Sequence, residues 1–308
     1  MLQTLATIVL TGLLLPQSLG FFAPAMPDYA FPSDQAIAAP PLPERIPNDS
    51  VGLRTSARSI LVTDTASGLG LYSKAPTQLA PIASITKLMT ALVVLDAQLD
   101  WDEEITIAPQ DQRAGNIVAL GPGERVSLRD TFNVMLIASS NEASAALARR
   151  VSPDNFVTLM NQKAAALGMT RTFFQEPTGL DSGNVSTVLD LLLLADAAFS
   201  RPEIRAAVQR PSYTFTPVGK RARTVVSTDD LLGSFLNQDE FSIVGGKTGY
   251  LSDAGYCLLL RVNHQDGRSL TLALLGAATA GDRWQEAKGL MDWVLDNYAW
   301  PAADNSQH

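Results

Sequence analysis

The sequence predicts an α+β fold: an antiparallel sheet of about five strands, flanked by helices, plus an inserted all-helical subdomain. Segments with strand chemistry lie near both ends of the chain, at about residues 55–83 and 205–300. The residues between them, about 98–200, show helical periodicity and helix-start signals. One sheet shared by both chain ends and packed against helices buries these apolar faces economically. A cleft between the two parts is the expected binding site.

The expected strands are short segments separated by turn residues. Residues 59–63 and 70–73 form one hairpin, and residues 256–262 and 269–275 form a second across Asp266-Gly267. Three further segments have strand chemistry, and the last of them is rich in glycine: 212–216, 223–227 and 242–250.

Capping residues mark several of the expected helices. The first helix begins near Ser84 and continues through an apolar segment to Leu95. Ser127 precedes a helix at 128–137 and is followed three positions later by an acidic residue, Asp130, which is a capping signal. The remaining expected helices are one at 142–150, one opened by Ser152-Pro153 and ended by Gly168, one at 187–194 capped by Ser186, and a closing helix at 282–298.

The chain is expected to have an export signal, a linker, a folded domain and a tail. Residues 1–20 include an apolar run that is too short to span a bilayer comfortably, which is typical of an export signal. No positive charge precedes this run, so an uncleaved signal anchor is the alternative. Residues 21–54 are a Pro- and Ala-rich linker, residues 55–300 the folded domain, and residues 301–308 the tail. The expected location is the periplasm or the outer face of the cytoplasmic membrane.

The composition excludes several classes of partner. The chain has 308 residues, of which 46% are hydrophobic and 18% charged, so it is long and apolar enough for a large core. Its formal net charge is -8 and it has no run of Lys and Arg, which argues against nucleic acid as a partner. For the same reason, we expect membrane contact only through the N-terminal segment. No partner protein can be inferred.

Cysteine and histidine are too few for several kinds of site. The single cysteine, Cys257, lies among apolar residues, so no intramolecular disulfide or cysteine-based metal site is expected. The two histidines are His264, beside a turn, and His308, the last residue, and neither is placed for a catalytic triad. We expect no metal and no cofactor. A nucleophilic mechanism would need another base, and lysine is the leading candidate.

Ser84 and Lys87 have the spacing of a nucleophile and its base. Three residues apart on one helix, they project from the same face. The positive end of the helix dipole would favour negative charge developing beside the serine. Taken alone, the pair also has simpler explanations: Ser84 could be an N-cap, and Lys87 could be a solvated helix residue.

Two further motifs follow in order along the chain. They are Ser139-Ser140-Asn141, 55 residues after Ser84, and Lys247-Thr248-Gly249, 108 residues after Ser139. Each motif is weak by itself, because short patterns recur by chance. A second Ser-x-Asn match, Ser182-Gly183-Asn184, illustrates this, and we expect it to belong to a loop bordering the cleft. The functional prediction therefore rests on the three motifs together, in this order and each in a suitable structural context.

The ordered set resembles low-molecular-mass penicillin-binding proteins of the serine D-alanyl-D-alanine carboxypeptidase and endopeptidase family. The similarity covers about residues 55–298 and extends to the segments 83–91, 135–143, 177–180, 246–250 and 254–257. It implies a β-lactamase/transpeptidase-like fold and a serine D,D-peptidase domain at 55–300. It further implies activity on peptidoglycan stem peptides through an acyl-enzyme, and covalent inhibition by β-lactams.

The resemblance also implies roles for individual residues. Ser84 would be the acylated nucleophile, and Lys87 the general base, provided that burial and nearby positive charge lower its pKa. Ser139 would relay a proton to the leaving amine, and Asn141 would position Lys87 and a substrate amide. Lys247 would attract a terminal carboxylate and help to lower the pKa of Lys87.

Three further residues are implied in substrate binding. Thr248 would hydrogen-bond the terminal carboxylate, and Gly249 would let the substrate backbone approach the strand closely. The backbone N–H group of Tyr250, with that of Ser84, would form the oxyanion hole.

Departures from the family pattern leave alternatives open. A class A β-lactamase would need a glutamate with an asparagine shortly after it, and the nearest candidate, Glu176, lacks that asparagine. Val185 stands where some relatives have a histidine, so no role is assigned to it. The short C-terminal part resembles the endopeptidase branch. A β-lactamase and a non-catalytic penicillin-binding sensor remain the alternatives, and carboxypeptidase and endopeptidase activities share all these residues.

Overall fold

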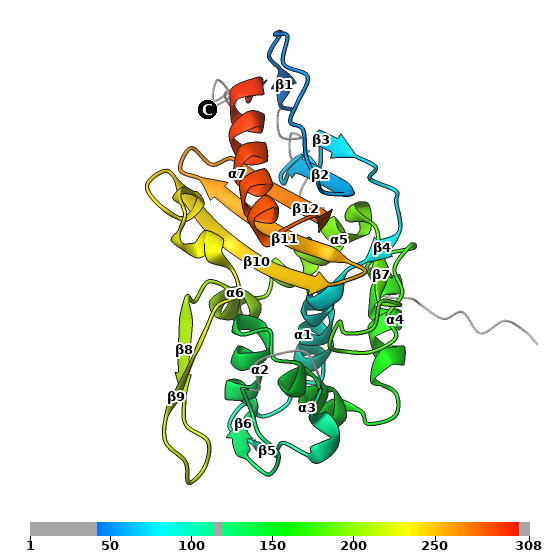
Figure 1. Cartoon of the computed structure of the whole chain (residues 1–308), viewed down its shortest axis with the longest axis vertical. Coiled ribbons are helices and arrows are strands. Elements are labelled where there is room, and N and C mark those ends of the chain that lie inside the picture. Colours follow the sequence, from blue (N-terminus) through cyan, green and yellow to red (C-terminus); the bar gives the residue numbers. More distant parts are fainter. Residues whose placement is uncertain (1–41, 114–118, 302–308) are drawn as a thin grey trace, which may run out of the picture. The chain divides into compact units, whose positions relative to one another are not determined.

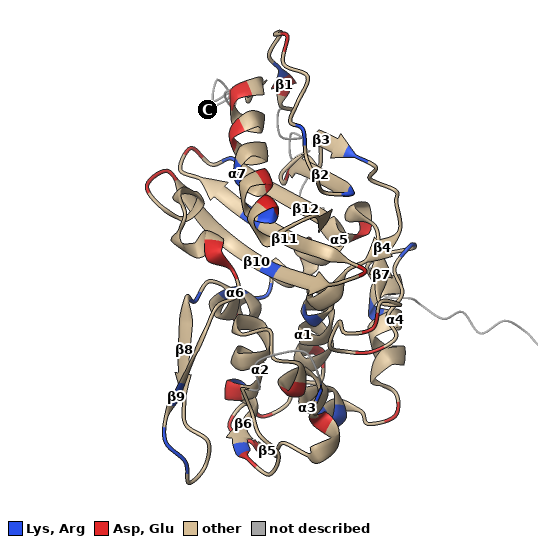
Figure 2. Cartoon of the chain, viewed as in Figure 1, with Lys and Arg blue, Asp and Glu red and all other residues tan. Residues whose placement is uncertain are grey.

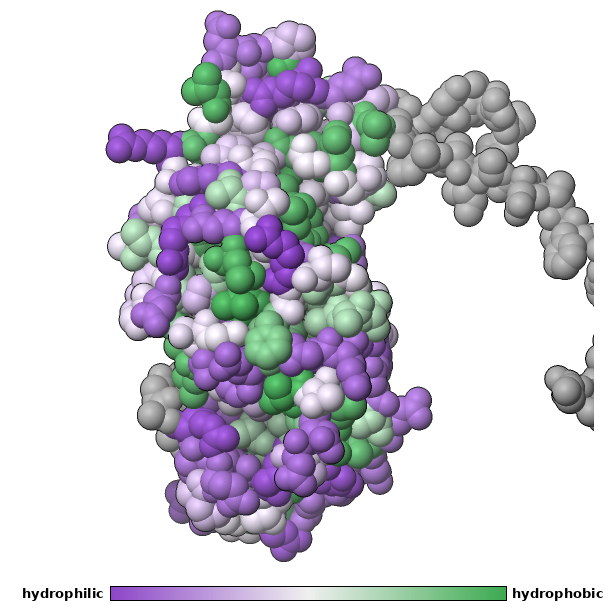
Figure 3. Space-filling view, turned by 90° about the vertical axis from the view of Figure 1, so that its right-hand side faces the viewer, coloured by the Kyte–Doolittle hydropathy of each residue, from purple (hydrophilic) through white to green (hydrophobic). Residues whose placement is uncertain are grey.

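The computed structural model describes residues 42–113 and 119–301, all within the unit formed by residues 39–308. The expected export signal, most of the linker and most of the tail lie outside the described residues. Within them, no helix combines the length and apolar character that a membrane span requires. On the face shown in Figure 3, apolar side chains are interspersed with hydrophilic ones.

A five-stranded antiparallel sheet joins the two ends of the chain, as predicted (Figure 1). In spatial order its strands are β10 (Phe241–Leu251), β11 (Gly255–His264), β12 (Ser269–Ala277), β2 (Ser59–Asp64) and β3 (Gly70–Lys74). The N-terminal hairpin β2–β3 pairs with the C-terminal strands through β12, where Leu272 lies opposite Val62. The α+β fold class predicted from the sequence is confirmed.

Both faces of the sheet are buried, and its side chains alternate between two cores. Ile60 and Val62 belong to the core beneath helix α7 (Ala280–Asn297), whereas Leu61 belongs to the larger core shared with the other helices. This period-two alternation explains why the central strands are apolar throughout.

Helix α1 (Thr86–Asp96) forms the centre of the helical part. Every residue of α1 except Asp96 is buried, as expected of a helix that is apolar on all sides. It packs against α2 (Leu128–Ile137), α3 (Asn141–Val151), α4 (Phe156–Ala166) and α5 (Val188–Phe199). A further short helix, α6 (Pro202–Val208), is not among the expected ones.

Within residues 42–113 and 119–301, four two-stranded ribbons surround the main elements: β1 (Glu44–Arg45) with β13 (Tyr298–Ala299), β4 (Ala80–Pro81) with β7 (Val185–Ser186), β5 (Glu104–Thr106) with β6 (Arg125–Ser127), and β8 (Ser212–Phe215) with β9 (Arg223–Val226). Two expected strands, 212–216 and 223–227, thus form a ribbon that is separate from the five-stranded sheet. Short 3-10 helices lie at Ala83–Ile85 (η1), Pro109–Asp111 (η2), Asp230–Gly233 (η3) and Phe235–Asn237 (η4).

Two helix starts differ from those predicted. The helix expected from Ser152-Pro153 begins only at Phe156, although Gly168, with φ +78°, follows its end as expected. The cap of α5 is Thr187 and not Ser186, because the backbone of Ser186 pairs with β4. Its hydroxyl lies 2.7 Å from Thr172 Oγ1. The predicted cap of α2 is confirmed, since Ser127 Oγ accepts a hydrogen bond from Asp130 N.

Candidate active site

The three sequence motifs meet at one cleft of about 250 Å³. Its walls come from η1, the start of α3 and the C-terminal end of β10, so both parts of the fold contribute. Six of the residues named from the sequence line it: Ser84, Ser139, Asn141, Thr248, Gly249 and Tyr250. The other two, Lys87 and Lys247, are fully buried behind these walls and hydrogen-bond to residues of the cleft.

Ser84 is presented by the 3-10 turn η1 and does not cap a helix. The N-cap of α1 is Ile85, and no side chain makes a capping hydrogen bond there. The preceding residue, Ala83, has a φ of +47°, a conformation that costs energy for a residue other than glycine. The serine hydroxyl is therefore held at the cleft by a strained turn, and the simpler explanation of Ser84 as an N-cap does not apply.

Lys87 lies in the first turn of α1 with its amine surrounded by three acceptors. Nζ is 3.0 Å from Ser84 Oγ and 2.8 Å from Asn141 Oδ1, and it also donates to the backbone carbonyl of Thr178. A neutral amine has two N–H groups and one lone pair. If Asn141 and Thr178 take the two N–H groups, the lone pair is directed at the Ser84 hydroxyl.

Burial lowers the pKa of Lys87 from 10.5 to about 7, and it does so against the charges of Glu176 and Glu142, which raise it. The expected lowering by burial is thus present, whereas the positive charge expected from Lys247 is not among its causes. The repulsion between the two lysines instead affects Lys247. Burial, Lys87 and Arg283 hold the pKa of Lys247 well below its ordinary value.

Lys247 connects β10 to the second motif. Its Nζ donates to Ser139 Oγ at 2.9 Å and to the backbone carbonyl of Thr248 at 3.0 Å. Ser139 has a φ of +57°, and Ser140 Oγ accepts from Ala143 N as the N-cap of α3. The two neighbouring serines therefore have different roles. The Ser140 hydroxyl caps α3, whereas Ser139 lines the cleft with its backbone in a strained conformation.

Three residues of the site were not predicted from the sequence: Arg283, Thr228 and Asp229. Thr228 Oγ1 lies 2.7 Å from Thr248 Oγ1, and both residues line the cleft. Arg283, on α7, also lines it and donates to the carbonyl of Gly249 at 3.4 Å. Asp229 lies behind them, where burial raises its pKa to about 6 although Arg283 and Lys247 lower it. No sequence motif marks them, because only the fold brings α7 and the end of β9 to β10.

Comparison with known proteins identifies the family. The family model described as D-alanyl-D-alanine carboxypeptidase matches residues 47–279. The chain belongs to the D-alanyl-D-alanine carboxypeptidase family.

Relatives of this peptidase include enzymes with both of the expected activities. The chain is 38% identical over 251 residues to a D-alanyl-D-alanine endopeptidase of Pseudomonas aeruginosa, covering 77% of this chain and 76% of that protein. A solved D-alanyl-D-alanine carboxypeptidase of Mycobacterium tuberculosis H37Rv matches with a TM-score of 0.73 and 29% identity, covering 81% of this chain and 95% of that one.

A third match is penicillin-binding protein D2 of Listeria monocytogenes in its cefotaxime-bound form. Its TM-score is 0.69 and its identity 32%, and the match covers 80% of this chain and all of that one. Together these findings identify the chain as a serine-type D-Ala-D-Ala peptidase with the penicillin-binding-protein fold. The family and fold that the sequence motifs predicted are confirmed.

Two glycines allow the walls of the peptidase cleft to meet behind Ser84. A Cβ at position 249 would lie 2.9 Å from the carbonyl oxygen of Ile82 and 3.1 Å from Ser84 N. A Cβ at Gly179, whose φ is +86°, would overlap the backbone of Ala83. The close approach that Gly249 permits in the structure is thus to the chain's own residues 82–84, which places β10 directly beside Ser84.

Glu176 holds the loop on the opposite side of Lys87. One carboxylate oxygen, Oε2, accepts from both the backbone N and the hydroxyl of Thr178, at 2.7 and 2.6 Å. The other, Oε1, accepts from Leu180 N at 2.9 Å and Asn184 Nδ2 at 2.8 Å. This carboxylate therefore fixes the carbonyl of Thr178 that receives Lys87. Asn184, from the second Ser-x-Asn match, is buried behind the site as part of this loop.

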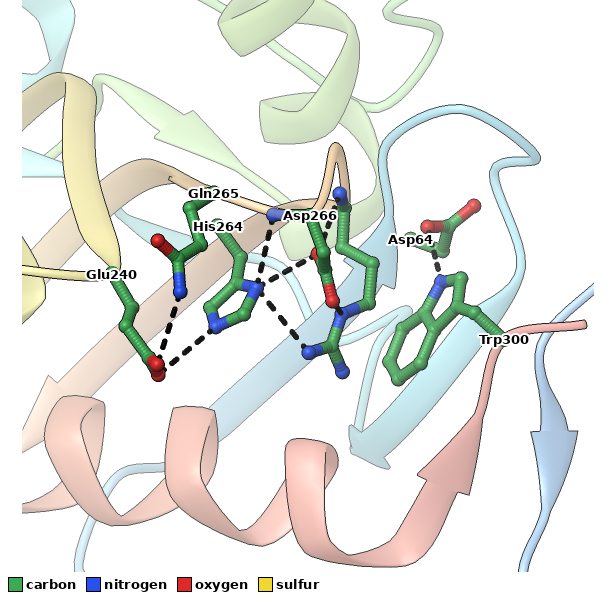
Figure 4. Close-up of polar contacts among 7 residues, drawn as sticks. Asp64, Glu240, His264, Gln265, Asp266 and Trp300 are labelled. Atoms are coloured by element: carbon green, nitrogen blue, oxygen red, sulfur yellow. Dashed lines mark hydrogen bonds and ion pairs between the residues drawn. The ribbon is translucent and has the colours of Figure 1, made fainter. Parts of the chain in front are cut away.

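His264 lies at the end of β11, outside the cleft. Figure 4 shows its ring between two carboxylates, with Nδ1 2.7 Å from Asp266 Oδ1 and Nε2 3.4 Å from Glu240 Oε2. Nearby, Trp300 Nε1 donates to Asp64 Oδ1 at 3.0 Å. The contacts of His264 with Asp266 and Glu240 connect the β11–β12 turn to the start of β10. Among the described residues, no group of three or more His, Cys, Asp or Glu side chains could hold a metal ion.

Proposed function

We propose that this peptidase cleaves D-alanyl peptide bonds of peptidoglycan stem peptides through an acyl-enzyme on Ser84, with Lys87 as the general base. The observation that carries the proposal is the buried Lys87 amine, 3.0 Å from Ser84 Oγ, with a pKa of about 7. A base with a pKa near the operating pH is both present in the neutral form and able to accept a proton.

Acylation would proceed in two proton-linked steps. Ser84 Oγ attacks the carbonyl carbon of the D-alanine while its proton passes to Lys87 Nζ, giving a tetrahedral oxyanion. The backbone N–H groups of Ser84 and Tyr250 would stabilise this oxyanion. When the C–N bond breaks, the proton held on Lys87 Nζ passes through the Ser139 hydroxyl, which Lys247 positions, to the leaving amine, and Lys87 becomes neutral again. Water then attacks the ester, and Lys87 again accepts and returns the proton.

The substrate carboxylate would bind at the far end of the cleft, near β10 and α7. Thr248 and Thr228 place their hydroxyls there, and Arg283 supplies a guanidinium that keeps its charge even in a buried site. A bound carboxylate would also favour the protonated form of Lys247, whose pKa is otherwise held down. Arg283 therefore joins the expected pair of Lys247 and Thr248 in this role.

Covalent inhibition by β-lactams follows from the same chemistry, because the acyl-enzyme forms through the same attack. Rapid hydrolysis of that acyl-enzyme is not expected. The nearest glutamate, Glu176, already accepts hydrogen bonds at both carboxylate oxygens from residues 178–184. It therefore serves the loop and does not activate a deacylating water, which favours the peptidase over the β-lactamase alternative.

Digestion of defined muropeptides tests the proposed function. Purified full chain is expected to release D-alanine from monomeric pentapeptides, to cut D-alanyl cross-links in dimers, or to do both. The ratio of the two rates would assign carboxypeptidase or endopeptidase preference. If neither substrate is cleaved by protein that binds penicillin, the proposed function is wrong.

A glutamine at position 176 is expected to shift the pH dependence of acylation to lower pH. The negative charge of Glu176 raises the pKa of Lys87, so the Glu176→Gln variant should lower that pKa and keep the amine neutral in more acidic solution. We expect the acid limb of kcat/KM to move down by roughly half a pH unit or more. Glu240→Gln, at an exposed position near His264, is the matched control. A limb that stays in place or moves to higher pH would contradict this.

We further propose that the chain acts outside the cytoplasm, with residues 1–20 as export signal or anchor and residues 55–300 as the D,D-peptidase domain. A substrate in the cell wall supports this location. The domain would comprise the sheet part, about 55–83 and 205–300, and the helical subdomain, about 98–200.

A further inference from the structure

A second cavity, of about 320 Å³, lies along α2 between that helix, α6 and the start of β8. We call it the α2–α6 groove and define it by six of its lining residues: Trp101, Arg129, Phe132, Asn133, Arg210 and Tyr213. A neighbouring cavity of about 240 Å³ also reaches Trp101. The two together give this side of α2 an extended recess that the peptidase chemistry does not use.

The groove has a rigid aromatic lining. The rings of Trp101 and Phe132 meet edge to face, with centroids 5.1 Å apart. Tyr213 donates its hydroxyl proton to Asp130 Oδ1 at 2.6 Å, and burial together with this bond raises the pKa of Tyr213 to about 12, so the hydroxyl stays protonated. Phe132 is buried, so Trp101 and Tyr213 supply the accessible aromatic surface, which suits a ligand with a flat apolar face, such as a pyranose ring.

Two guanidinium groups flank this lining. Arg210 lies over the ring of Tyr213 at 5.3 Å and donates to Asn133 Oδ1 at 3.3 Å. Arg129 lies 6.0 Å from the Trp101 ring centroid and pairs with Asp102 at 3.2 Å, where both side chains are largely exposed. An exposed ion pair of this kind contributes little, so Arg129 can exchange its partner for a ligand carboxylate.

The side chains that line the groove carry a small net positive charge, because Arg129 and Arg210 outnumber Glu203. Residues 204–228, which include Arg210 and the β8–β9 ribbon, contain five Lys or Arg and no Asp or Glu, although the formal net charge is -8. Figure 2 shows the resulting basic positions on the ribbon. Glu203, the acidic residue of the groove, pairs with Arg201. The surroundings therefore favour an anionic ligand.

Both the paired ends of the β8–β9 ribbon and helix α2 lead from the groove to the active-site cleft. Ser227 N donates to the carbonyl of Pro211 at 2.8 Å, so Arg210 and the cleft residue Thr228 flank one pair of hydrogen-bonded residues. Along α2, ten residues separate Arg129 from Ser139, roughly 15 Å at the helical rise. An extended peptide of about five residues spans such a distance, at roughly 3.3 Å per residue.

We propose that the α2–α6 groove binds the glycan-linked part of the same peptidoglycan polymer whose stem peptide occupies the cleft. A pyranose ring would lie against Trp101, and a carboxylate of an attached stem peptide would pair with Arg210 and Arg129. The inference rests on the proposed function. Binding of the polymer in the groove would make the enzyme more active on polymer than on short peptides, because this second contact raises the local concentration of scissile bonds at the cleft.

The test compares two substrates in the full chain. One is an acylated D-Ala-D-Ala tripeptide that carries no sugar, and the other is intact cross-linked sacculi. Arg210→Glu is expected to lower kcat/KM on sacculi by about tenfold, and to leave the tripeptide within about twofold of wild type. Arg54→Glu, a charge reversal at an exposed position outside the groove and outside residues 204–228, is the matched control and should change neither. Equal activity of Arg210→Glu and wild type on sacculi, or equal losses on both substrates, would overturn the proposal.

A binding measurement separates this inference from the proposed function. In the Ser84→Ala background, which cannot turn over substrate, a disaccharide tetrapeptide is titrated by calorimetry alongside free tetrapeptide and peptide-free glycan. We expect the disaccharide tetrapeptide to bind most tightly, and its affinity to fall with Arg210→Glu and with added salt. Identical affinity in Arg210→Glu would overturn the groove assignment, even if the peptidase activity is confirmed. Wild-type protein that cleaves neither substrate would instead refute the proposed function.

Discussion

Replacing Ser84 with alanine is expected to abolish covalent labelling of the full chain by a fluorescent penicillin. It should also lower peptidase activity by roughly 10³-fold or more, because the acyl-enzyme can no longer form. The structure supports this, since Ser84 Oγ lies in the cleft beside the buried amine of Lys87 and makes no helix cap. Gel fluorescence after incubation with the penicillin, and peptide release followed by chromatography, measure the two effects.

Ser140→Ala is the matched control for this change. Ser140 is one residue from Ser139, but its hydroxyl caps α3, so its loss should cost about 1 kcal/mol of stability and leave labelling intact. Full labelling of Ser84→Ala would refute the assignment of the nucleophile.

Replacing Lys87 with alanine is expected to nearly abolish acylation, with a loss of roughly 10²- to 10⁴-fold at neutral pH. In the wild type the acylation rate should rise with pH through about 7, because only the neutral amine can accept the Ser84 proton. That limb should be absent from the residual activity of Lys87→Ala. Stopped-flow acylation by penicillin across pH 5–9 measures both effects, at roughly one point per half unit.

Lys163→Ala is a suitable control, since Lys163 pairs with Asp96 on the surface of the helical part. It should leave the acylation rate and its pH dependence unchanged. A Lys87→Ala variant that retains the wild-type rate, or retains the limb near pH 7, would assign the base to another residue.

Lys87 should also leave a signature in the pH dependence of stability. Its pKa is about 7 in the folded chain and near 10.5 when unfolded, so between these values the unfolded state binds more protons. The contribution of Lys87 to stability therefore rises with pH across this window. Urea unfolding of wild type and Lys87→Ala at several pH values should show a steeper rise for the wild type.

The spacing of the sequence motifs predicted which residues meet, because these residues sit at fixed points of regular elements. Ser84 lies in the 3-10 turn η1, which leads directly into α1, where Lys87 lies in the first turn, and Asn141 begins the helix that Ser140 caps. The sheet was predictable from strands at both chain ends joined by recognisable turns. Helix starts were less predictable. Ser186 and Thr187 are both good capping residues, and only the pairing of β7 with β4 leaves Thr187 as the N-cap of α5.

The electrostatic surroundings of the site could not be read from the sequence. Arg283 looks like any other charged residue on the closing helix until α7 crosses the sheet beside Gly249. Asp229 and Glu176 likewise act through burial and through loop contacts that no short pattern encodes. For the same reason, the sequence suggested that Lys247 lowers the pKa of Lys87, whereas the structure attributes that lowering to burial.

Mass-spectrometric mapping of the residue that carries the acyl group tests the central claim most directly. Wild-type protein is incubated with penicillin, digested, and the modified peptide sequenced. Acyl transfer to Ser84, assisted by Lys87, predicts that the full penicilloyl mass is found on Ser84 alone. A stable adduct on Ser139, Ser140 or any other residue, with Ser84 unmodified, would contradict it.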